Sequence, residues 1–359
     1  MSAQYVVSMD SGHSVMKGAT WDGGNLVRSS FQAIAEPVQE QQAMEVDYAI
    51  QVDGVWYAMQ ESGRLIDSSK EIQLAHSSFH GSTGQTAQMC WFFEKNNIFG
   101  KQLYLIISVP YSDSKDKLLI EKLKSRRVFE WTSQNGESRN VEFEEVIIYP
   151  QGVGALRFFQ AYTGLGPKKV SMIDIGSITL DIVSLRKFNT DAPYKYNVGA
   201  SGSIREGAAG KSLMDDSLSR IRDINGLTNV TESYHDISDR MQYKEYKITS
   251  PGGVVRDVEG VINQSRKEFT LNSVKRCKGI INHDWENTDA FILSGGISLV
   301  LDLAQWECRG RTYLTSPWAN TLGQLYQNLD DGDQEQLKIE LKKIEKVKFL
   351  DVDGNVTEI

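Results

Sequence analysis

The sequence predicts a duplicated α/β fold, in which two units of the same design each carry a hairpin loop suited to phosphate. In the first unit, the apolar run 5–9 leads into a polar, glycine-containing turn at 10–18, and an extended pattern continues to Trp21. In the second unit, the apolar run 169–173 leads into the turn 174–181, and a strand pattern then resumes. Both segments show the order strand, aspartate, glycine with hydroxyl residues, strand. Because they lie about half a chain apart, we expect two related units that hold phosphate groups between them.

The first loop combines residue types that bind phosphate and metal. A short glycine-containing turn lets several backbone N–H groups converge on one anion. Ser11 and Ser14 add hydroxyl donors, and Lys17 adds a point charge. Asp10 can hold a divalent metal ion through water molecules. Taken alone, an Asp-Ser-Gly sequence also makes an ordinary hairpin turn, so the second loop is the observation that favours phosphate binding.

The two loops resemble the phosphate motifs of the actin-like ATPase superfamily, which includes actin, heat-shock chaperone ATPases and sugar kinases. Three further segments match in order: 149–155 is similar to the first connecting helix, 291–298 to the adenosine motif and 316–323 to the second connecting helix. The Ala-Asn-x-x-Gly pattern that begins at Ala319 is similar to that of the bacterial plasmid-segregation actins (the ParM/StbA group). The resemblance spans residues 5 to 326. It implies an actin-like fold, with two ribonuclease-H-like domains around a nucleotide cleft and a smaller outer subdomain on each.

A helix-ending segment divides the chain into two expected domains. Gly164-Leu165-Gly166-Pro167 ends the preceding helix, because Pro167 cannot extend it and disfavours helix at the residue before it. We therefore expect domain I to cover residues 1–166 and domain II to cover residues 167–317. The C-terminal residues 318–359 are expected to pack back on domain I.

The other elements follow from periodicity and from turn residues. Asp53-Gly54 joins two alternating runs within 47–60, which predicts either a hairpin of the first outer subdomain near filament contacts or an ordinary surface hairpin. Apolar residues at helical spacing predict helices over 83–96, 114–125, 151–163, 211–222, 261–281 and 334–346. Apolar or alternating runs predict strands at 26–35, 103–110, 194–198 and 290–293, and hairpins within 128–146 and 347–356. A glycine-rich loop is expected at 199–210, and the polar residues 228–249 are expected to form the second outer subdomain.

The resemblance implies roles for the loop residues. Asp10 and Asp174 would hold Mg²⁺, and Lys17 would bind the β- and γ-phosphate oxygens of ATP. Gln151 would orient the attacking water; eukaryotic actin has glutamine at this position, whereas segregation actins usually have glutamate. His13 either donates to the γ-phosphate or points to solvent. The phosphate cradle would consist of backbone N–H groups and hydroxyls from both loops, contributed by Ser11, Gly12, His13, Ser14, Gly176, Ser177, Ile178 and Thr179.

The adenosine would lie on a second group of small residues, Gly295, Gly296, Ile297 and Ser298. Gly207 and Gly210 would let the ribose and adenine approach closely, with a plain helix entry as the alternative. The segment that contains them ends like a P-loop, but that pattern requires glycine where the chain has Arg205. His76 and His80 are four residues apart without the glutamate of a zinc-protease helix, so we expect a surface loop or helix there rather than a metal site.

Composition bounds the class of protein. The chain has 359 residues, a 40% hydrophobic content and no apolar stretch near the roughly 18 residues that span a bilayer. Its N-terminus lacks a basic-then-apolar signal pattern, so we expect a cytoplasmic protein. Cys90, Cys277 and Cys308 lack metal-binding spacing and are expected to be reduced, mostly buried thiols.

Three functions fit the resemblance: a nucleotide-driven, filament-forming ATPase that segregates plasmid DNA, a non-polymerising ATPase scaffold, and a small-molecule kinase. A kinase would need a catalytic aspartate that is free of the metal, and the sequence offers no clear candidate. The implied cofactors are ATP, with GTP left open, and Mg²⁺.

The expected partners are further copies of the chain in a filament and a small, basic DNA-binding adaptor, with no membrane partner. A net charge of −8 argues against direct DNA binding, because phosphate neutralisation needs a basic surface. A local basic patch is left open, around Lys122, Lys124, Arg126 and Arg127.

Overall fold

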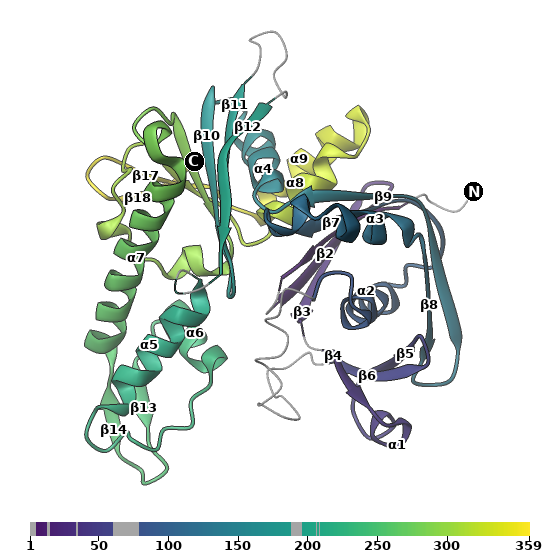
Figure 1. Cartoon of the computed structure of the whole chain (residues 1–359), viewed down its shortest axis with the longest axis horizontal. Helices are drawn as coiled ribbons and strands as arrows, with labels where there is room; N and C mark the ends of the chain where they lie inside the picture. Colours follow the sequence, from purple (N-terminus) through teal and green to yellow (C-terminus); the bar gives the residue numbers. More distant parts are fainter. Residues whose placement is uncertain are drawn as a thin grey trace. The chain divides into compact units, whose positions relative to one another are not determined.

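The computed structural model describes residues 5–12, 15–33, 35–59, 79–187, 196–205, 207 and 209–359. The chain divides into two compact units. Unit 1 comprises Met1–Gly164 and Trp318–Glu345, and unit 2 comprises Leu165–Pro317 and Lys346–Ile359. Each unit is built around its own mixed β-sheet (Figure 1).

The sheet of unit 1 has an antiparallel edge joined to a parallel centre. Strand β1 pairs antiparallel with β2 and parallel with β7, and β7 pairs parallel with β9. Every residue of β1 is buried, as expected for a central strand. In sheet order the strands are β3 (Asn25–Gln32), β2 (Val15–Asp22), β1 (Val6–Ser11), β7 (Gly100–Val109), β9 (Ser138–Pro150), β8 (Val128–Ser133), β5 (Ala49–Val52), β6 (Val55–Met59) and β4 (Ala35–Val38).

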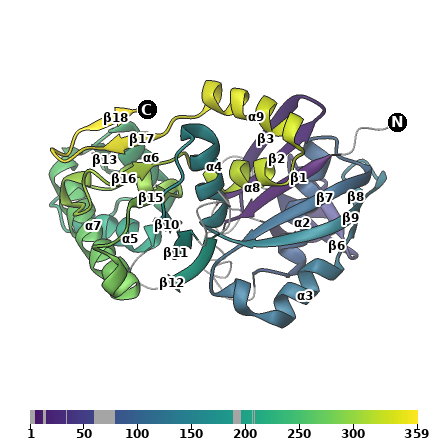
Figure 2. The same cartoon turned by 90° about the horizontal axis from the view of Figure 1, so that it is seen from above.

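The helices of unit 1 are α1 (Glu40–Ala43), α2 (Thr83–Lys95), α3 (Lys117–Ser125), α4 (Val153–Thr163), α8 (Ala319–Gln327) and α9 (Asp331–Ile344), with a 3₁₀ turn η3 (Asp113–Lys115). Helix α2 packs directly on β2, because a Cβ at Gly18 would lie only 2.2 Å from the ring of Phe92. Helices α4 and α8 lie side by side (Figure 2). The helices predicted around α2, α3, α4 and α9 are present, with ends that shift by a few residues.

The sheet of unit 2 repeats the pattern of unit 1. Strand β10 pairs antiparallel with β11 and parallel with β15, as β1 does with β2 and β7. In sheet order its strands are β12 (Tyr196–Ile204), β11 (Leu180–Lys187), β10 (Lys169–Ile175), β15 (Ala290–Ser294), β16 (Thr312–Leu314), β17 (Lys348–Leu350) and β18 (Val356–Glu358). The predicted duplication of an α/β unit is confirmed by these two matching strand orders.

Helices cover the sheet of unit 2 and form its outer part. Helix α7 (Glu259–Ile281) runs along β11 and β12 and packs on α5 (Gly210–Arg222) (Figure 1). The polar segment predicted as an outer region contains α6 (Tyr234–Tyr243) and β13 (Lys247–Thr249), and β13 pairs with β14 (Val255–Asp257). Short 3₁₀ turns complete the unit: η4 (Asn282–Asp284), η5 (Gly296–Val300) and η6 (Leu303–Gln305).

The C-terminal residues 318–359 were expected to pack on domain I, but they are divided between the two units. Helices α8 and α9 do belong to unit 1, where Arg28 pairs with Glu345 and lies over the ring of Trp318. Residues 346–359 instead join unit 2, because β17 pairs antiparallel with β16 and β18 completes the sheet edge. The physical reason is strand pairing, since β17 satisfies the edge of β16 while Leu350 is buried in the core of unit 2.

The segment expected to be a glycine-rich loop at 199–210 is also different. Strand β12 continues to Ile204, paired with β11 past an irregularity between Val183 and Leu185. Gly202 lets this strand pass close to Ile280 of α7, since a Cβ there would lie 3.2 Å from the isoleucine side chain. The first two residues of the predicted strand 194–198 lie outside the described residues.

All three cysteines are buried free thiols, as expected. Burial raises the pKa of the Cys90 and Cys277 thiols well above the ordinary value, and it raises the pKa of Cys308 to about 12. All three therefore stay protonated and unreactive near neutral pH. Among the helices of the described residues, none combines the length and the hydropathy that crossing a membrane would require.

Candidate nucleotide site

One group of candidate site residues, in unit 1, centres on Asp10 near the end of β1. Asp10 is buried, and its Oδ1 accepts a hydrogen bond of 2.9 Å from Nε2 of Gln151. Gln151 is also buried, and its backbone N–H donates to the carbonyl of Val109 at the end of β7. Lys17 lies directly opposite Asp10 in the β1–β2 register, so both side chains leave the same face of the sheet. Two predicted site residues are therefore placed against Asp10: Gln151 by a hydrogen bond and Lys17 by its position across the β1–β2 pair.

The loop after Asp10 offers a hydroxyl group and a glycine turn that a phosphate could use. The buried hydroxyl of Ser11 has no hydrogen-bond partner among the described residues. A Cβ at Gly12 would lie 2.7 Å from the carbonyl oxygen of Val15, so a larger residue would force the loop to shift. His13 and Ser14, the other two residues predicted here, lie outside the described residues. An unpartnered buried hydroxyl and a glycine cradle fit the expected anion.

His80 is buried against the first residues of this loop. Its burial corrects the expectation that it lies in a surface loop or helix. The residue is only 4% exposed, with Nδ1 2.9 Å from Oδ2 of Asp113 and Nε2 3.3 Å from the carbonyl oxygen of Ser11. Asp113 in turn accepts from the hydroxyl of Ser112. This buried polar chain fixes the backbone at the start of the phosphate loop. His76, its partner in the sequence pattern, lies outside the described residues.

Replacing His80 with alanine is expected to lower the free energy of unfolding by about 1–3 kcal/mol, because the carbonyl of Ser11 and the carboxylate of Asp113 lose a buried partner. Urea unfolding followed by circular dichroism measures the change. His283→Ala, at an exposed histidine of unit 2, is the control and should stay within about 0.5 kcal/mol of the wild type. Equal effects of the two substitutions would contradict the supporting role of His80.

A separate group of candidate site residues, in unit 2, centres on Asp174 near the end of β10. Asp174 lies directly opposite Asp181 in the β10–β11 register, and both carboxylates are buried. Ser294, beside Asp174 in the parallel β10–β15 register, has a buried hydroxyl without a partner among the described residues. Like charges facing one another across a strand pair are destabilising. The arrangement therefore suits a cation, and a hydrated Mg²⁺ is a cation that carboxylates hold well.

The second loop, between β10 and β11, is closed by a backbone hydrogen bond. It also accepts hydrogen bonds from the start of α5. The N–H of Gly176 donates to the carbonyl of Thr179, which closes the turn between β10 and β11. The N–H groups of Gly210 and Lys211 donate to the carbonyls of Gly176 and Ser177. Residues 176–178, which include Ile178, are partly exposed, whereas Thr179 is buried. Gly210 therefore reaches the phosphate loop at the N-terminal end of α5, where backbone dipoles favour negative charge.

The predicted adenosine residues follow β15 in a tight turn. Gly295 has a φ of +86°, and a Cβ there would lie 2.4 Å from Oδ1 of Asp174. Only glycine combines this backbone conformation with such a close approach. Gly296 has no atom within 4 Å of where a Cβ would stand, and the hydroxyl of Ser298 donates to the carbonyl of Gly295. Ile297 is buried and anchors the turn in the core. The turn is thus held against the metal-binding aspartate proposed from the sequence.

Two residues that support the candidate site residues, Arg276 in unit 2 and Asn320 in unit 1, were not singled out from the sequence. Gly207, with a φ of +66°, lies against Arg276 of α7, whose guanidinium would be 2.9 Å from a Cβ at this position. In unit 1, Oδ1 of Asn320 accepts from the N–H groups of Gly152 and Ala155, at 2.8 and 3.2 Å. This cap starts α4 directly after Gln151. The Ala-Asn-x-x-Gly pattern was the available signal for Asn320, whereas no local pattern marks Arg276.

Comparison with known proteins identifies the fold. The sequence matches no known family profile and no curated protein. Among the solved structures it resembles, a 15-stranded ParM filament from Clostridium botulinum is 17% identical, with a TM-score of 0.69 over 90% of this chain and 98% of that chain. The archaeal actin homologue Ta0583 in complex with ADP is 17% identical, with a TM-score of 0.66 over 89% and 97%. Bacillus thuringiensis ParM with ATP is 14% identical, with a TM-score of 0.57 over 91% and 98%.

These structural matches extend over almost the whole of both chains. The fold class and the resemblance predicted from the pair of loops are thereby confirmed. The chain has the actin-like fold.

Proposed function

We propose that this chain, which has the actin-like fold, is a Mg²⁺-dependent ATPase that assembles into filaments. The observation that carries the proposal is the repeated placement of a buried aspartate at the end of the first strand of each sheet. Asp10 and Asp174 occupy these equivalent positions, and each precedes a glycine loop. The matches with ADP-bound Ta0583 and with ATP-bound ParM support nucleotide as the ligand.

The residues of unit 1 would position the phosphates and the attacking water. Lys17, beside Asp10, would hold phosphate oxygens by charge, and the Ser11 hydroxyl and the N–H of Gly12 would donate to them. Gln151 is fixed through Nε2 on Asp10, which leaves its Oε1 to accept a hydrogen bond from a water molecule. Phosphoryl transfer to water needs such orientation more than it needs covalent chemistry.

The residues of unit 2 would hold the metal ion and the nucleoside. Asp174 would bind the hydration shell of Mg²⁺, and Asp10 is proposed for the same role in unit 1. A bound Mg²⁺ supplies neutralisation of the charge that develops on the phosphate oxygens. The turn 295–298 would carry the adenosine, and Thr179 and Ser177 would complete the phosphate cradle.

Filament formation is the second part of the proposal. Two of the similar structures are of filaments, the 15-stranded ParM filament and the Alp12 filament. Head-to-tail contacts between copies of one chain produce open filaments when the rotation between copies does not close a ring. We extend the proposal to plasmid DNA segregation through a separate basic adaptor, because a net charge of −8 disfavours direct contact with duplex DNA.

Addition of ATP and Mg²⁺ to micromolar protein is expected to raise light scattering and to move the protein into the pellet on high-speed sedimentation. Phosphate release measured in the same samples reports hydrolysis, and a parallel GTP arm reports base preference. Samples with ADP, or with EDTA in place of Mg²⁺, are the controls and should stay in the supernatant. Duplex DNA added to the protein without an adaptor should also remain in the supernatant at physiological salt.

Hydrolysis without sedimentation over a wide range of protein concentration would favour the non-polymerising scaffold. Transfer of phosphate to a small molecule rather than to water would favour the kinase. Salt-sensitive retention of duplex DNA by this chain alone would refute the adaptor and would direct attention to the basic residues Lys122, Lys124, Arg126 and Arg127.

A further inference from the structure

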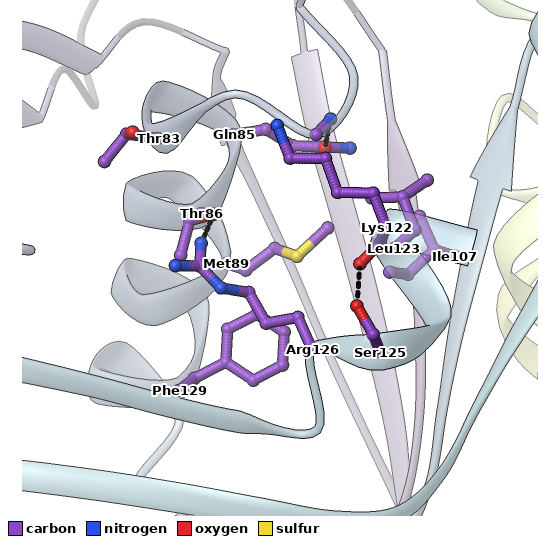
Figure 3. Close-up of a pocket in the computed structure, with 11 residues that line it drawn as sticks. Thr83, Gln85, Thr86, Met89, Ile107, Lys122, Leu123, Ser125, Arg126 and Phe129 are labelled. Carbon is purple, nitrogen blue, oxygen red and sulfur yellow. Dashed lines mark hydrogen bonds between the residues drawn. The ribbon is translucent and has the colours of Figure 1, made fainter. Parts of the chain in front are cut away.

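Unit 1 contains a cavity of about 350 Å³ that lies apart from the residues assigned to nucleotide (Figure 3). Helix α2 forms one side, helix α3 and the residues that follow it form another, and β7 and β8 contribute the remaining wall. A volume of this size is at the lower end of the range for small-molecule sites. Of the predicted site residues that the structure describes, none lines the cavity.

The floor of the cavity is apolar and rigid. Met89, Leu123 and Phe129 line it, and each belongs to the hydrophobic core of unit 1. Their side chains are less than 10% exposed, so they offer a fixed surface rather than mobile surface chains. Such a floor suits the hydrocarbon part of a ligand.

Gln85 supplies an unsatisfied donor in the wall of the cavity. Its side chain is 1% exposed, and Oε1 accepts a hydrogen bond of 2.6 Å from the N–H of Gly81. Nε2 of the same amide is buried without a partner among the described residues. The bond from Gly81 fixes which amide atom is the oxygen, so the orphan group is an N–H donor. A buried donor without a partner costs about 1–3 kcal/mol, and an acceptor on a ligand would remove this cost.

Two cations lie at the edge of the same cavity. Arg126 is anchored there, since its guanidinium donates to the hydroxyl of Thr86 and pairs with Asp53 at 3.0 Å. Lys122, which lines the same cavity as Gln85 (Figure 3), makes no ion pair with any carboxylate of the described residues. Among the described residues that line the cavity, none is acidic. The polar side of the cavity therefore presents donors and positive charge.

We propose that this cavity binds a small organic anion, whose carboxylate or phosphate meets Lys122, Arg126 and the Gln85 amide while its apolar part lies on Met89, Leu123 and Phe129. The charged group gives the orphan donor its acceptor and gives Lys122 its counter-ion. The apolar part fills a surface that water would solvate poorly. The proposal concerns unit 1 alone and does not depend on nucleotide binding.

Isothermal titration of the full chain with three probes of one shape tests the proposal: phenylacetate, phenyl phosphate and the neutral 2-phenylethanol. At least one of the two anions is expected to bind saturably, and more tightly than the alcohol. The tighter of the two anions identifies the head group as carboxylate or phosphate. Lys122→Gln is expected to weaken anion binding about tenfold, because it removes a charge-assisted contact.

Lys124→Gln is the matched control, since it makes the same change of charge on an exposed residue of the same helix that does not line the cavity. It should bind the anions as the wild type does. The proposal is overturned if the folded wild type binds no probe saturably, if the alcohol binds as tightly as the anions, or if the two lysine variants bind equally. Circular dichroism of both variants confirms that each is folded.

Discussion

Replacing Asp174 with alanine is expected to lower phosphate release from ATP by about 10²–10³-fold, a loss of about 3–4 kcal/mol of transition-state stabilisation. The carboxylate is buried at the end of β10 and faces Asp181, so its charge is the one best placed in unit 2 to hold a metal ion. Phosphate release at saturating ATP and Mg²⁺ measures the effect. Asp174→Asn, which keeps the volume but removes the charge, should show a loss of similar size.

Two further variants separate catalysis from folding. Asp239→Ala, at an exposed aspartate of α6, makes the same chemical change away from the site and should leave the rate unchanged. Asp181→Ala should have a smaller effect than Asp174→Ala, because Asp181 accepts a hydrogen bond from Ser203 of β12 and so helps to hold β11 in the sheet. Unchanged phosphate release in folded Asp174→Ala would remove Asp174 from the metal site.

The two hairpins that carry the proposed phosphate loops could be predicted from sequence because each is a local structure. A strand, a tight turn and a returning strand need only neighbouring residues, and the alternation of side chains fixes which of them share a face. Asp10 and Lys17 therefore end up opposite one another once the hairpin forms. The repeat of this design in β10 and β11 also predicted the duplicated fold. Hydrophobic periodicity predicted the helices for the same local reason.

The C-terminal hairpin shows that local sequence patterns can predict two strands without predicting which sheet they join. Residues 347–356 were predicted to form a hairpin, and the structure contains β17 and β18 there. Their partner is β16, and no pattern near Lys348 shows which sheet edge is available. The prediction of packing on domain I was therefore wrong for this segment, although α9 does lie in unit 1. Strand pairing between distant segments depends on the assembled sheet.

The supporting residues of the site could not be predicted for a similar reason. His80 contacts the carbonyl of Ser11, which is 69 residues away, and its burial follows from the packing around α2. The contact of Arg276 with Gly207 likewise joins a helix to a turn that is distant in sequence. Sequence patterns indicate the residues that face a ligand more readily than those that hold them in place.

Replacing Gly323 with alanine is expected to destabilise unit 1 by about 3 kcal/mol or more, at the upper end of the cost of overpacking. A Cβ at Gly323 would lie 1.8 Å from the carbonyl oxygen of Gly154 and 2.5 Å from the backbone nitrogen of Phe158. Both obstacles are backbone atoms of α4, so no side-chain rotation can relieve the clash, and α8 must move away. The melting temperature should fall by about 6–12 °C, as measured by circular dichroism.

Gly332→Ala is the matched control for this substitution, because it lies in helix α9 of the same unit and a Cβ there makes only an ordinary contact, 3.5 Å from Oδ1 of Asp330. Alanine is the better helix former, so this variant should be about 0.5–1 kcal/mol more stable than the wild type. The two substitutions should thus have opposite signs. Separation of α8 from α4 would also carry Asn320 away from the N–H of Gly152, which loosens the start of α4 beside Gln151. Hydrolysis by Gly323→Ala should therefore fall even at temperatures where the variant is folded, and an unchanged melting temperature and rate would show that the two helices are not packed backbone to backbone.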